Sequence, residues 1–203
     1  MVLENKLGIT NSAELARGEE RISKKKAVSL FKNPEFDNLE VGTTDALMAI
    51  HKHLFDDIYD FAGKVRTVNL AKGNFRFAPL MYLENSLANI DKMPQSTYDE
   101  IIEKYVEMNV AHPFREGNGR ASRIWLDLIL KKNLRLCVDW SKVDKFQYLS
   151  AMERSPVNSL EIRHLLKAAL TKDIDSRQVY MRGIQNSYYY EDLYKYDIEN
   201  LDE

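Results

Sequence analysis

The chain has 203 residues, of which 44% are hydrophobic and 30% charged, which is the composition of an ordinary folded domain and excludes disordered, collagen-like and disulfide-rich proteins. A net charge of −2 gives no basic surface, so we expect no direct nucleic-acid binding. One cysteine, the absence of a signal-peptide pattern and the absence of an apolar run of about 18 residues predict a cytoplasmic protein without a membrane segment.

The N-terminal part of the chain predicts two amphipathic helices. Apolar residues recur at helical spacing over residues 12–31, and an Asn-Pro pair ends this segment. The basic run at residues 24–26 predicts a solvated helix face. Thr43 or Thr44 can cap a second helix that continues to about residue 59, because a threonine oxygen accepts hydrogen bonds from the free N–H groups of a first turn.

A β-hairpin is the only sheet predicted. Residues 65–70 alternate and are rich in β-branched side chains, a turn follows over residues 72–74, and residues 75–77 complete the pair. The remaining patterns predict helices over about residues 79–91, 97–111, 119–132, 142–154, 159–170, 176–185 and 187–195. The expected fold class is therefore mainly α, a helical bundle with one small β-hairpin.

The segment from residue 111 to residue 123 has the strongest chemical signal. One helix ends and another begins within about seven residues, with Gly117-Asn118-Gly119 at the start of the second. Successive backbone N–H groups there can form an anion-binding nest, and the helix N-terminus adds partial positive charge. Arg120 and Arg123 are three residues apart and share a helix face near that end. Two guanidinium groups beside a nest predict a ligand with several phosphates.

Two further residues indicate how such a ligand would react. Glu116 would repel a bare phosphate but suits Mg²⁺, which prefers one or two carboxylates together with phosphate oxygens. His112 precedes the loop, and an ordinary imidazole pKa of about 6.5 suits a general base. The alternative is a plain corner between helices, with solvated arginines and glycines that serve only the turn. The combination favours a Mg-nucleotide site to which the nucleophile comes from outside.

This segment resembles the signature of the Fic domain family, His-x-Phe-x-(Asp/Glu)-Gly-Asn-Gly-Arg-x-x-Arg, at every specified position from His112 to Arg123. A chance match somewhere in the chain has odds on the order of 10⁻⁸ at average residue usage. Residues 50–66 are similar to the helix that precedes the motif in that family, and residues 73–79 are similar to its flap. The resemblance covers most of residues 10–195 and implies the family's helical bundle.

The resemblance also implies a reaction, the transfer of AMP from ATP to a Ser, Thr or Tyr hydroxyl of a target protein, with pyrophosphate leaving. His112 would deprotonate the hydroxyl, and Glu116 would bind Mg²⁺ between the α- and β-phosphates. Arg120 would hold the β-phosphate region and Arg123 the γ-phosphate, with Phe114 anchoring the loop. The residues that would bind the nucleotide are Gly117, Asn118, Gly119, Arg120 and Arg123. The flap residues that would pair with the target backbone are Gly73, Asn74, Phe75, Arg76 and Phe77.

The C-terminal segment resembles a built-in inhibitor. Ser187-Tyr-Tyr-Tyr-Glu191 is similar to the (Ser/Thr)-x-x-x-Glu motif of Fic proteins that carry their inhibitory helix at the C-terminus. Ser187 can cap a short helix, and Glu191 can pair with Arg123 and so withdraw it from the γ-phosphate. Asp192 departs from the Gly or Asn that usually follows in the family. A tyrosine-rich surface helix is the alternative. We expect a catalytic domain over residues 1–180, with the inhibitory helix and tail, residues 181–203, packed on it.

Several hypotheses about activity stay open at this point. Tyrosines of the tail are candidates for self-modification, namely Tyr188, Tyr189, Tyr190 and Tyr194. Removal of AMP from the target and a different phosphate-group transfer are enzymatic alternatives, and a nucleotide-sensing module without turnover is the alternative from another class. The sequence is compatible with a homo-oligomer and indicates neither the target protein nor the signal that releases the inhibitory helix. His51 is expected to be structural, since its helical spacing from His53 makes a poor pair of metal ligands.

Overall fold

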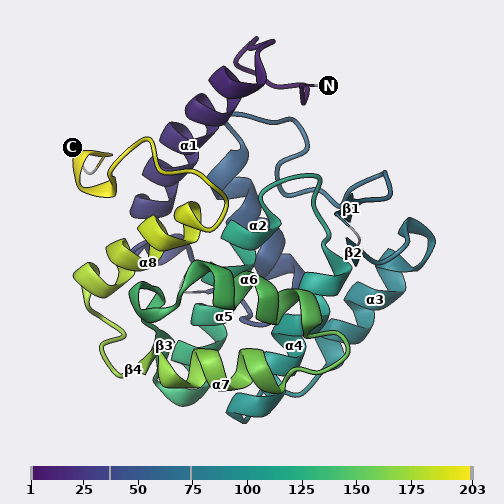
Figure 1. Ribbon diagram of the computed structural model, residues 1–203, viewed down its shortest axis with the longest axis vertical. Coiled ribbons are helices and arrows are strands. Elements are labelled where there is room, and N and C mark those ends of the chain that lie inside the picture. The colour runs from purple at the N-terminus through teal and green to yellow at the C-terminus, as the bar shows by residue number, and fades with distance from the viewer. Residues whose placement is uncertain (1, 37, 74, 202–203) are drawn as a thin grey trace.

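The computed structural model describes residues 2–36, 38–73 and 75–201, and over these ranges it is mainly α-helical (Figure 1). The helices are α1 (Ser12–Ser29), α2 (Thr44–Phe55), α3 (Leu80–Lys92), α4 (Tyr98–Ala111), α5 (Asn118–Leu134), α6 (Lys145–Arg154), α7 (Leu160–Ala168) and α8 (Arg177–Tyr189). Short 3₁₀ turns are η1 (Pro34–Phe36), η2 (Trp140–Lys142) and η3 (Ile198–Leu201). The strands are β1 (Ala71–Lys72), β2 (Phe75–Arg76), β3 (Cys137–Val138) and β4 (Leu170–Thr171). The mainly α fold class predicted from the sequence is confirmed.

Side-chain caps begin several helices where the sequence predicts them. Thr43 Oγ1 accepts a hydrogen bond from Ala46 N at 3.1 Å and begins α2. Thr97 and Glu100 form the reciprocal capping box that begins α4. These local hydrogen bonds fix where the helices begin, and therefore where the connecting loops lie.

Helix α5 lies at the centre of the bundle and contacts α2, α4 and α8. The side chains of Trp125, Leu126, Ile129 and Leu130 are fully buried, and burying a side chain of this size stabilises a fold by about 1.5–3 kcal/mol. The indole N–H of Trp125 donates to Thr43 O at 2.9 Å, so its one polar atom is satisfied. The first turn of α5 is thereby attached to a rigid core.

The sheet structure differs from the prediction in two ways. Residues 65–70 are not a strand, because Arg66 N donates to Pro113 O and Asn69 Oδ1 accepts from Leu80 N, which ties the segment to neighbouring loops. The hairpin is the shorter β1–β2 pair, with Ala71 opposite Arg76. The expectation of a single hairpin is also wrong, since β3 and β4 form a second antiparallel pair. These strands are far apart in the chain, so no turn sequence between them predicts their pairing.

The C-terminal region forms one α-helix where two were predicted. Helix α8 continues through Ser187 to Tyr189, so Ser187 lies in its last turn and does not cap a separate helix. The helix contacts α1, α5 and η2, and it buries Met181, Ile184 and Tyr188 in the common core. In Figure 1, α8 and the β1–β2 hairpin lie on opposite sides of α2 and α5.

Among the described residues, no helix combines the length and the apolar character needed to cross a membrane.

The basic run in α1 is not uniformly solvated, contrary to the prediction. The Lys24 side chain is 0% exposed and pairs at 2.8 Å with Glu20, whose side chain is 2% exposed. Lys24 Nζ also donates to Tyr196 O at 2.6 Å, and Glu20 accepts from the backbone N–H groups of Lys195 and Tyr196. This buried ion pair therefore holds the tail that follows α8 against α1.

We expect Lys24→Met to lower the free energy of unfolding by about 3–5 kcal/mol, because the change leaves the Glu20 carboxylate buried without its cation. Urea denaturation followed by circular dichroism measures this loss. Lys25→Met is the matched control, since Lys25 is exposed in the next position and its loss should change the free energy of unfolding by less than about 0.5 kcal/mol. Equal effects of the two substitutions would contradict the inference.

Candidate active site

The corner between α4 and α5 is closed by Asn118. Its side chain accepts from Phe114 N at 2.8 Å and donates to Phe114 O at 2.7 Å, which ties the two ends of the loop together. Phe114 is fully buried and its ring stacks on His51 with centroids 3.8 Å apart. Phe114 therefore anchors the loop as the resemblance implies, and the Asn118 side chain serves the loop while its backbone belongs to the first turn of α5.

His51 supports the loop from below, so its expected structural role is confirmed. Nδ1 accepts from Gly63 N at 2.9 Å, which leaves Nε2 to carry the proton and donate to Glu116 O at 2.8 Å. Burial lowers the pKa of His51 to about 3, so the ring stays neutral and this tautomer persists. The carbonyl of Glu116 is fixed in this way, and the Glu116 side chain projects from a positioned backbone.

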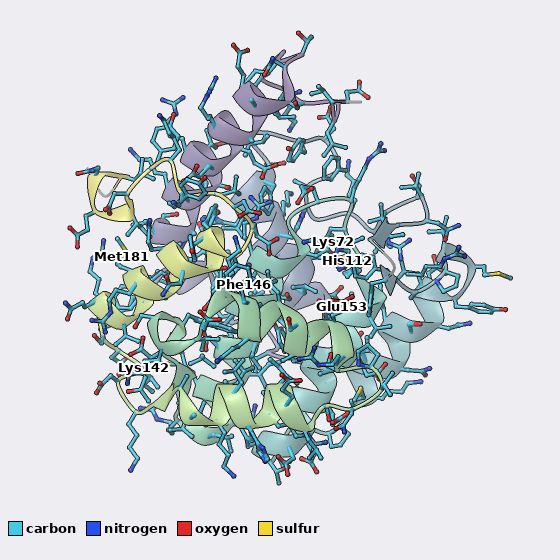
Figure 2. The ribbon with its side chains drawn as sticks, viewed as in Figure 1. Lys72, His112, Lys142, Phe146, Glu153 and Met181 are labelled. Atoms are coloured by element: carbon cyan, nitrogen blue, oxygen red, sulfur yellow. The ribbon has the colours of Figure 1, made fainter. Side chains whose placement is uncertain are left out.

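A cavity of about 590 Å³ lies between this corner, the β1–β2 hairpin and α6. Lys72, His112 and Glu153, labelled in Figure 2, line it from the hairpin, the end of α4 and α6 respectively. The predicted site residues that line it are Gly73, Phe75, Phe77, His112, Glu116, Gly117, Asn118, Gly119, Arg120, Arg123 and Glu191. The structure thus brings together residues that are far apart in the chain, and it places the predicted base in the same cavity as both arginines.

His112 follows α4 directly, in a left-handed conformation with φ of 48°. Its ring stacks on Phe77 with centroids 3.6 Å apart, and its backbone oxygen accepts from Arg66 Nε at 2.8 Å. The Nδ1 atom of the ring is buried. Burial lowers the pKa of His112 to about 4, so the ring is neutral at pH 7 and can accept a proton.

The N-terminus of α5 faces the cavity. Gly117 has φ of 76°, and a side chain there would clash with the Phe55 ring, so both the conformation and the close approach require glycine. A side chain at Gly119 would clash with Glu191 Oε1, which means that the Glu191 carboxylate lies over the first turn of α5. The unpaired N–H groups and the partial positive charge of a helix N-terminus attract an anion. In this structure the Glu191 carboxylate lies beside this turn.

Arg123 is held by the end of α8. Its Nε donates to Ser187 Oγ at 2.7 Å, and its Nη2 donates to Ser187 O at 2.8 Å and to Glu191 Oε1 at 2.9 Å. The predicted pairing of Glu191 with Arg123 is confirmed as a contact. Burial by itself would raise the pKa of Glu191, but Arg123 more than offsets this and lowers it to about 2, so the pair stays charged at physiological pH. Lys72 Nζ lies 3.9 Å from the other oxygen of Glu191.

Asp192, the residue that departs from the Gly or Asn of the resembling motif, has a left-handed backbone conformation. Its φ is 60°, in the left-handed region that Asp tolerates better than most residues. Its side chain pairs with Lys145, and Leu193 N donates back to Tyr188 O at 3.0 Å. These contacts stabilise the end of α8 with Asp192 in its left-handed conformation.

The tail tyrosines divide into two pairs. Tyr188 and Tyr190 are buried, with Tyr188 OH donating to Ser23 Oγ at 2.9 Å and Tyr190 OH donating to Val143 O at 2.7 Å. Tyr189 and Tyr194 are 44% and 68% exposed. In this conformation the expectation of self-modification is therefore sterically open only for Tyr189 and Tyr194 among the four.

The hairpin residues do not all face the cavity. Gly73, Phe75 and Phe77 line it, whereas the exposed Arg76 does not, and Asn74 lies outside the described residues. The sequence analysis assigned no role to Arg66 in this region, or to Glu19 of α1, which accepts from Arg120 Nη1 at 2.5 Å. For Glu19 a signal existed, since it lies four residues after Leu15 on the buried face of α1.

The cavity offers one protein carboxylate, that of Glu116, as a ligand for Mg²⁺. Glu116 lines the cavity and is 46% exposed, and its hydrogen bonds from Gly117 N and Arg120 Nη2 both use Oε1, so Oε2 can face a cation. No cluster of three or more metal-ligating side chains occurs within the described residues. A site with one protein carboxylate suits Mg²⁺, which takes its other ligands from phosphates and water.

Comparison with known proteins identifies relatives by sequence. A model described as Fic/DOC family matches residues 42–130. Protein adenylyltransferase VbhT of Bartonella schoenbuchensis is 30% identical over 192 residues, which are 88% of this chain and 39% of VbhT. The probable protein adenylyltransferase y4lH of Sinorhizobium fredii is 30% identical over 166 residues, 76% of this chain and 83% of y4lH. The chain thus spans well under half of VbhT but most of y4lH.

Solved structures show the same fold. BepC of Bartonella tribocorum, solved with bound AMPPNP, has a TM-score of 0.70 at 20% identity, covering 84% of this chain and 93% of BepC. The N-terminal Fic domain of a Bep effector from Bartonella sp. AR 15-3 has a TM-score of 0.72 at 20% identity, covering 85% and 88% of the two chains. With the complete motif from His112 to Arg123 and these relatives, the chain belongs to the Fic/DOC family.

Proposed function

We propose that the chain is a protein adenylyltransferase, which transfers AMP from ATP to a hydroxyl side chain of a target protein. The observation that carries the proposal is the single cavity that His112, Glu116, the N-terminus of α5 and Arg123 share. The names of the relatives VbhT and y4lH, and the AMPPNP bound to BepC, support the same activity.

In the proposed reaction the target hydroxyl gives its proton to His112. The hydroxyl oxygen forms a bond to the α-phosphorus of ATP, and the bond between that phosphorus and the α–β bridging oxygen breaks, which releases pyrophosphate. The low pKa of His112 supports its part, since the ring is neutral and unprotonated when the hydroxyl arrives. Backbone N–H groups of residues 117–119 and the two arginines would offset the negative charge of the phosphates.

Glu116 would hold Mg²⁺ in this scheme. The ion would neutralise charge on the α- and β-phosphates and favour departure of pyrophosphate. The carboxylate is suited to this because His51 fixes the Glu116 backbone from below while the side chain remains half-exposed in the cavity.

The β1–β2 hairpin would receive the target. Its exposed strands offer backbone N–H and C=O groups to an extended segment of another protein, and the hairpin residues Phe75 and Phe77 lie at the edge of the cavity. A target strand added here would bring its hydroxyl toward His112, which stacks on Phe77.

The proposed activity is restrained by the C-terminal segment, whose described residues 181–201 pack on the catalytic unit that precedes them. Glu191 lies over the first turn of α5 and pairs with Arg123. A γ-phosphate would therefore be excluded from this space and could not bind Arg123. Tyr189 and Tyr194 are the proposed sites of self-modification, because they are exposed on either side of Glu191.

Position-specific labelling of ATP tests the proposal. Incubation of the Glu191→Gly variant with a cell lysate and ATP–Mg²⁺ should label a target protein when the α-phosphate is radioactive and leave it unlabelled when only the γ-phosphate is. Label from γ-phosphate would indicate a kinase instead. Nucleotide binding without label from either position would indicate a sensor without turnover, and both outcomes overturn the proposal.

A further inference from the structure

Arg120 is held by a carboxylate that lies 101 residues earlier in the chain. Its Nη1 donates to Glu19 Oε1 at 2.5 Å, while its Nη2 donates to Glu116 Oε1 at 3.2 Å. Arg120 and Glu19 are both buried, with side chains 2% and 8% exposed. Their contact is therefore a charge-assisted hydrogen bond shielded from water, unlike a surface ion pair, whose contribution would be small.

Glu19 is itself fixed on its other side. The Tyr59 hydroxyl donates to Oε2, and Tyr59 is buried with its ring stacked on Phe61, centroids 4.5 Å apart. With each oxygen bound to a different buried donor, the carboxylate has a single orientation. It can therefore impose a single orientation on the guanidinium group.

The surroundings of Arg120 give it few other anchors. The guanidinium carbon lies 4.9 Å from the centroid of the Phe55 ring and 5.4 Å from that of Tyr188, and Nε is buried without a partner among the described residues. Without Glu19, the only carboxylate bonded to Arg120 in the described structure would be Glu116. Glu116 is half-exposed and is the proposed Mg²⁺ ligand, so a closer pair with Arg120 would disturb both groups.

We propose that Glu19 is a positioning residue for nucleotide binding: it holds one side of the Arg120 fork, so that the other side faces Glu116 and the cavity where a β-phosphate would bind. This inference rests on the proposed function, because it assumes that the cavity takes a nucleotide. It extends the site to α1, outside the motif and outside the region 42–130 that the family model matches.

The affinities of the chain for ADP and AMP, measured by isothermal titration calorimetry, test this inference. ADP carries the β-phosphate and AMP does not, and neither requires Arg123, so the inhibitory contact can stay in place. We expect Glu19→Gln to weaken ADP binding about tenfold while AMP binding stays unchanged, because a misdirected Arg120 loses about one charge-assisted hydrogen bond to the β-phosphate.

The direction of the change in ADP affinity distinguishes a positioning role of Glu19 from a simple effect of its negative charge. Removing a negative charge near the phosphates should by itself strengthen ADP binding, so tighter or unchanged ADP binding in Glu19→Gln would overturn the inference. Glu20→Gln is the matched control, since Glu20 is the adjacent buried carboxylate but holds the C-terminal tail. It should cost stability and leave the ratio of ADP to AMP affinity unchanged.

Two further variants complete the test. Tyr59→Phe removes only the hydrogen bond that fixes Glu19, and it should lower the same ratio by a smaller factor, which keeps the inference testable if Glu19→Gln folds poorly. Arg120→Ala should lower the ratio at least as much as Glu19→Gln. If Arg120→Ala left the ratio of ADP to AMP affinity unchanged, the proposed role of Arg120 itself would be contradicted. If Arg120→Ala lowered this ratio and Glu19→Gln did not, only the role of Glu19 would be overturned.

Discussion

The Glu191→Gly variant should transfer AMP to its target about 10–100 times faster than the unaltered chain. Glu191 places a carboxylate over the first turn of α5 and binds Arg123 at 2.9 Å. Removing it takes away the carboxylate partner of Arg123, although the bonds to Ser187 remain, and clears the space beside Gly119 for a γ-phosphate. A charge-assisted hydrogen bond in a buried site is worth about 1.5–3 kcal/mol. Initial rates of labelling from α-labelled ATP, measured with both proteins at equal concentration, give the factor.

Asp192→Asn is the matched control for this experiment. It also removes a carboxylate, one residue further along, but that carboxylate pairs with Lys145 and not with Arg123. Asn tolerates the left-handed conformation at this position as well, so helix α8 should end unchanged. A rate that rises equally in both variants would mean that net charge, and not the Arg123 contact, restrains the enzyme. An unchanged rate in Glu191→Gly would contradict the inhibitory role.

Glu191 should not act as a pH switch. Burial alone would raise the pKa of Glu191, but Arg123 lowers it to about 2, below the ordinary carboxyl value of 4.5. The pair therefore contributes its full stabilisation above pH 4.5 and loses it as the pH falls from 4.5 through 2. A change of pH near neutrality should therefore leave the pair of Glu191 and Arg123 intact.

His112→Ala should lower the rate of AMP transfer about 10²–10⁴-fold, the usual contribution of a general base, while nucleotide affinity stays within about threefold. The imidazole lines the cavity with the phosphate-binding groups, but its bonds do not hold the loop, since Asn118 and His51 do that. The measurement is best made in the Glu191→Gly background, where the starting rate is high, with ADP affinity determined in parallel.

His53→Ala is the control for loss of an imidazole elsewhere. His53 contacts Lys26 O and Ser29 Oγ, away from the cavity residues, and its removal should leave the transfer rate unchanged. If His112→Ala retained more than a tenth of the parent rate, the base would have to be another group. If it lost ADP binding together with the rate, His112 would be a structural residue of the loop.

The chemistry proposed for the corner between α4 and α5 could be predicted from the sequence. The spacing from His112 to Arg123 is local, so one helix end, one short loop and one helix start suffice to predict that these groups meet. Capping signals are local too, which is why Thr43 and the Thr97–Glu100 box were found at the right places. The family match and the position of Glu191 one turn after Ser187 also depend only on short segments of sequence.

Which distant residues complete the candidate site depends on how the helices pack against one another. Glu19 and Arg120 are brought together by the packing of α1 against the bundle, and the β3–β4 pairing joins segments with no turn between them. The same packing buries Lys24, although the basic run at residues 24–26 predicted a solvated helix face. Its ammonium group binds the Glu20 carboxylate and the Tyr196 carbonyl in the interior. The Glu20 partner lies four residues earlier on the same helix, but the Tyr196 carbonyl that also accepts from Lys24 belongs to the tail, and sequence periodicity along α1 does not contain that partner.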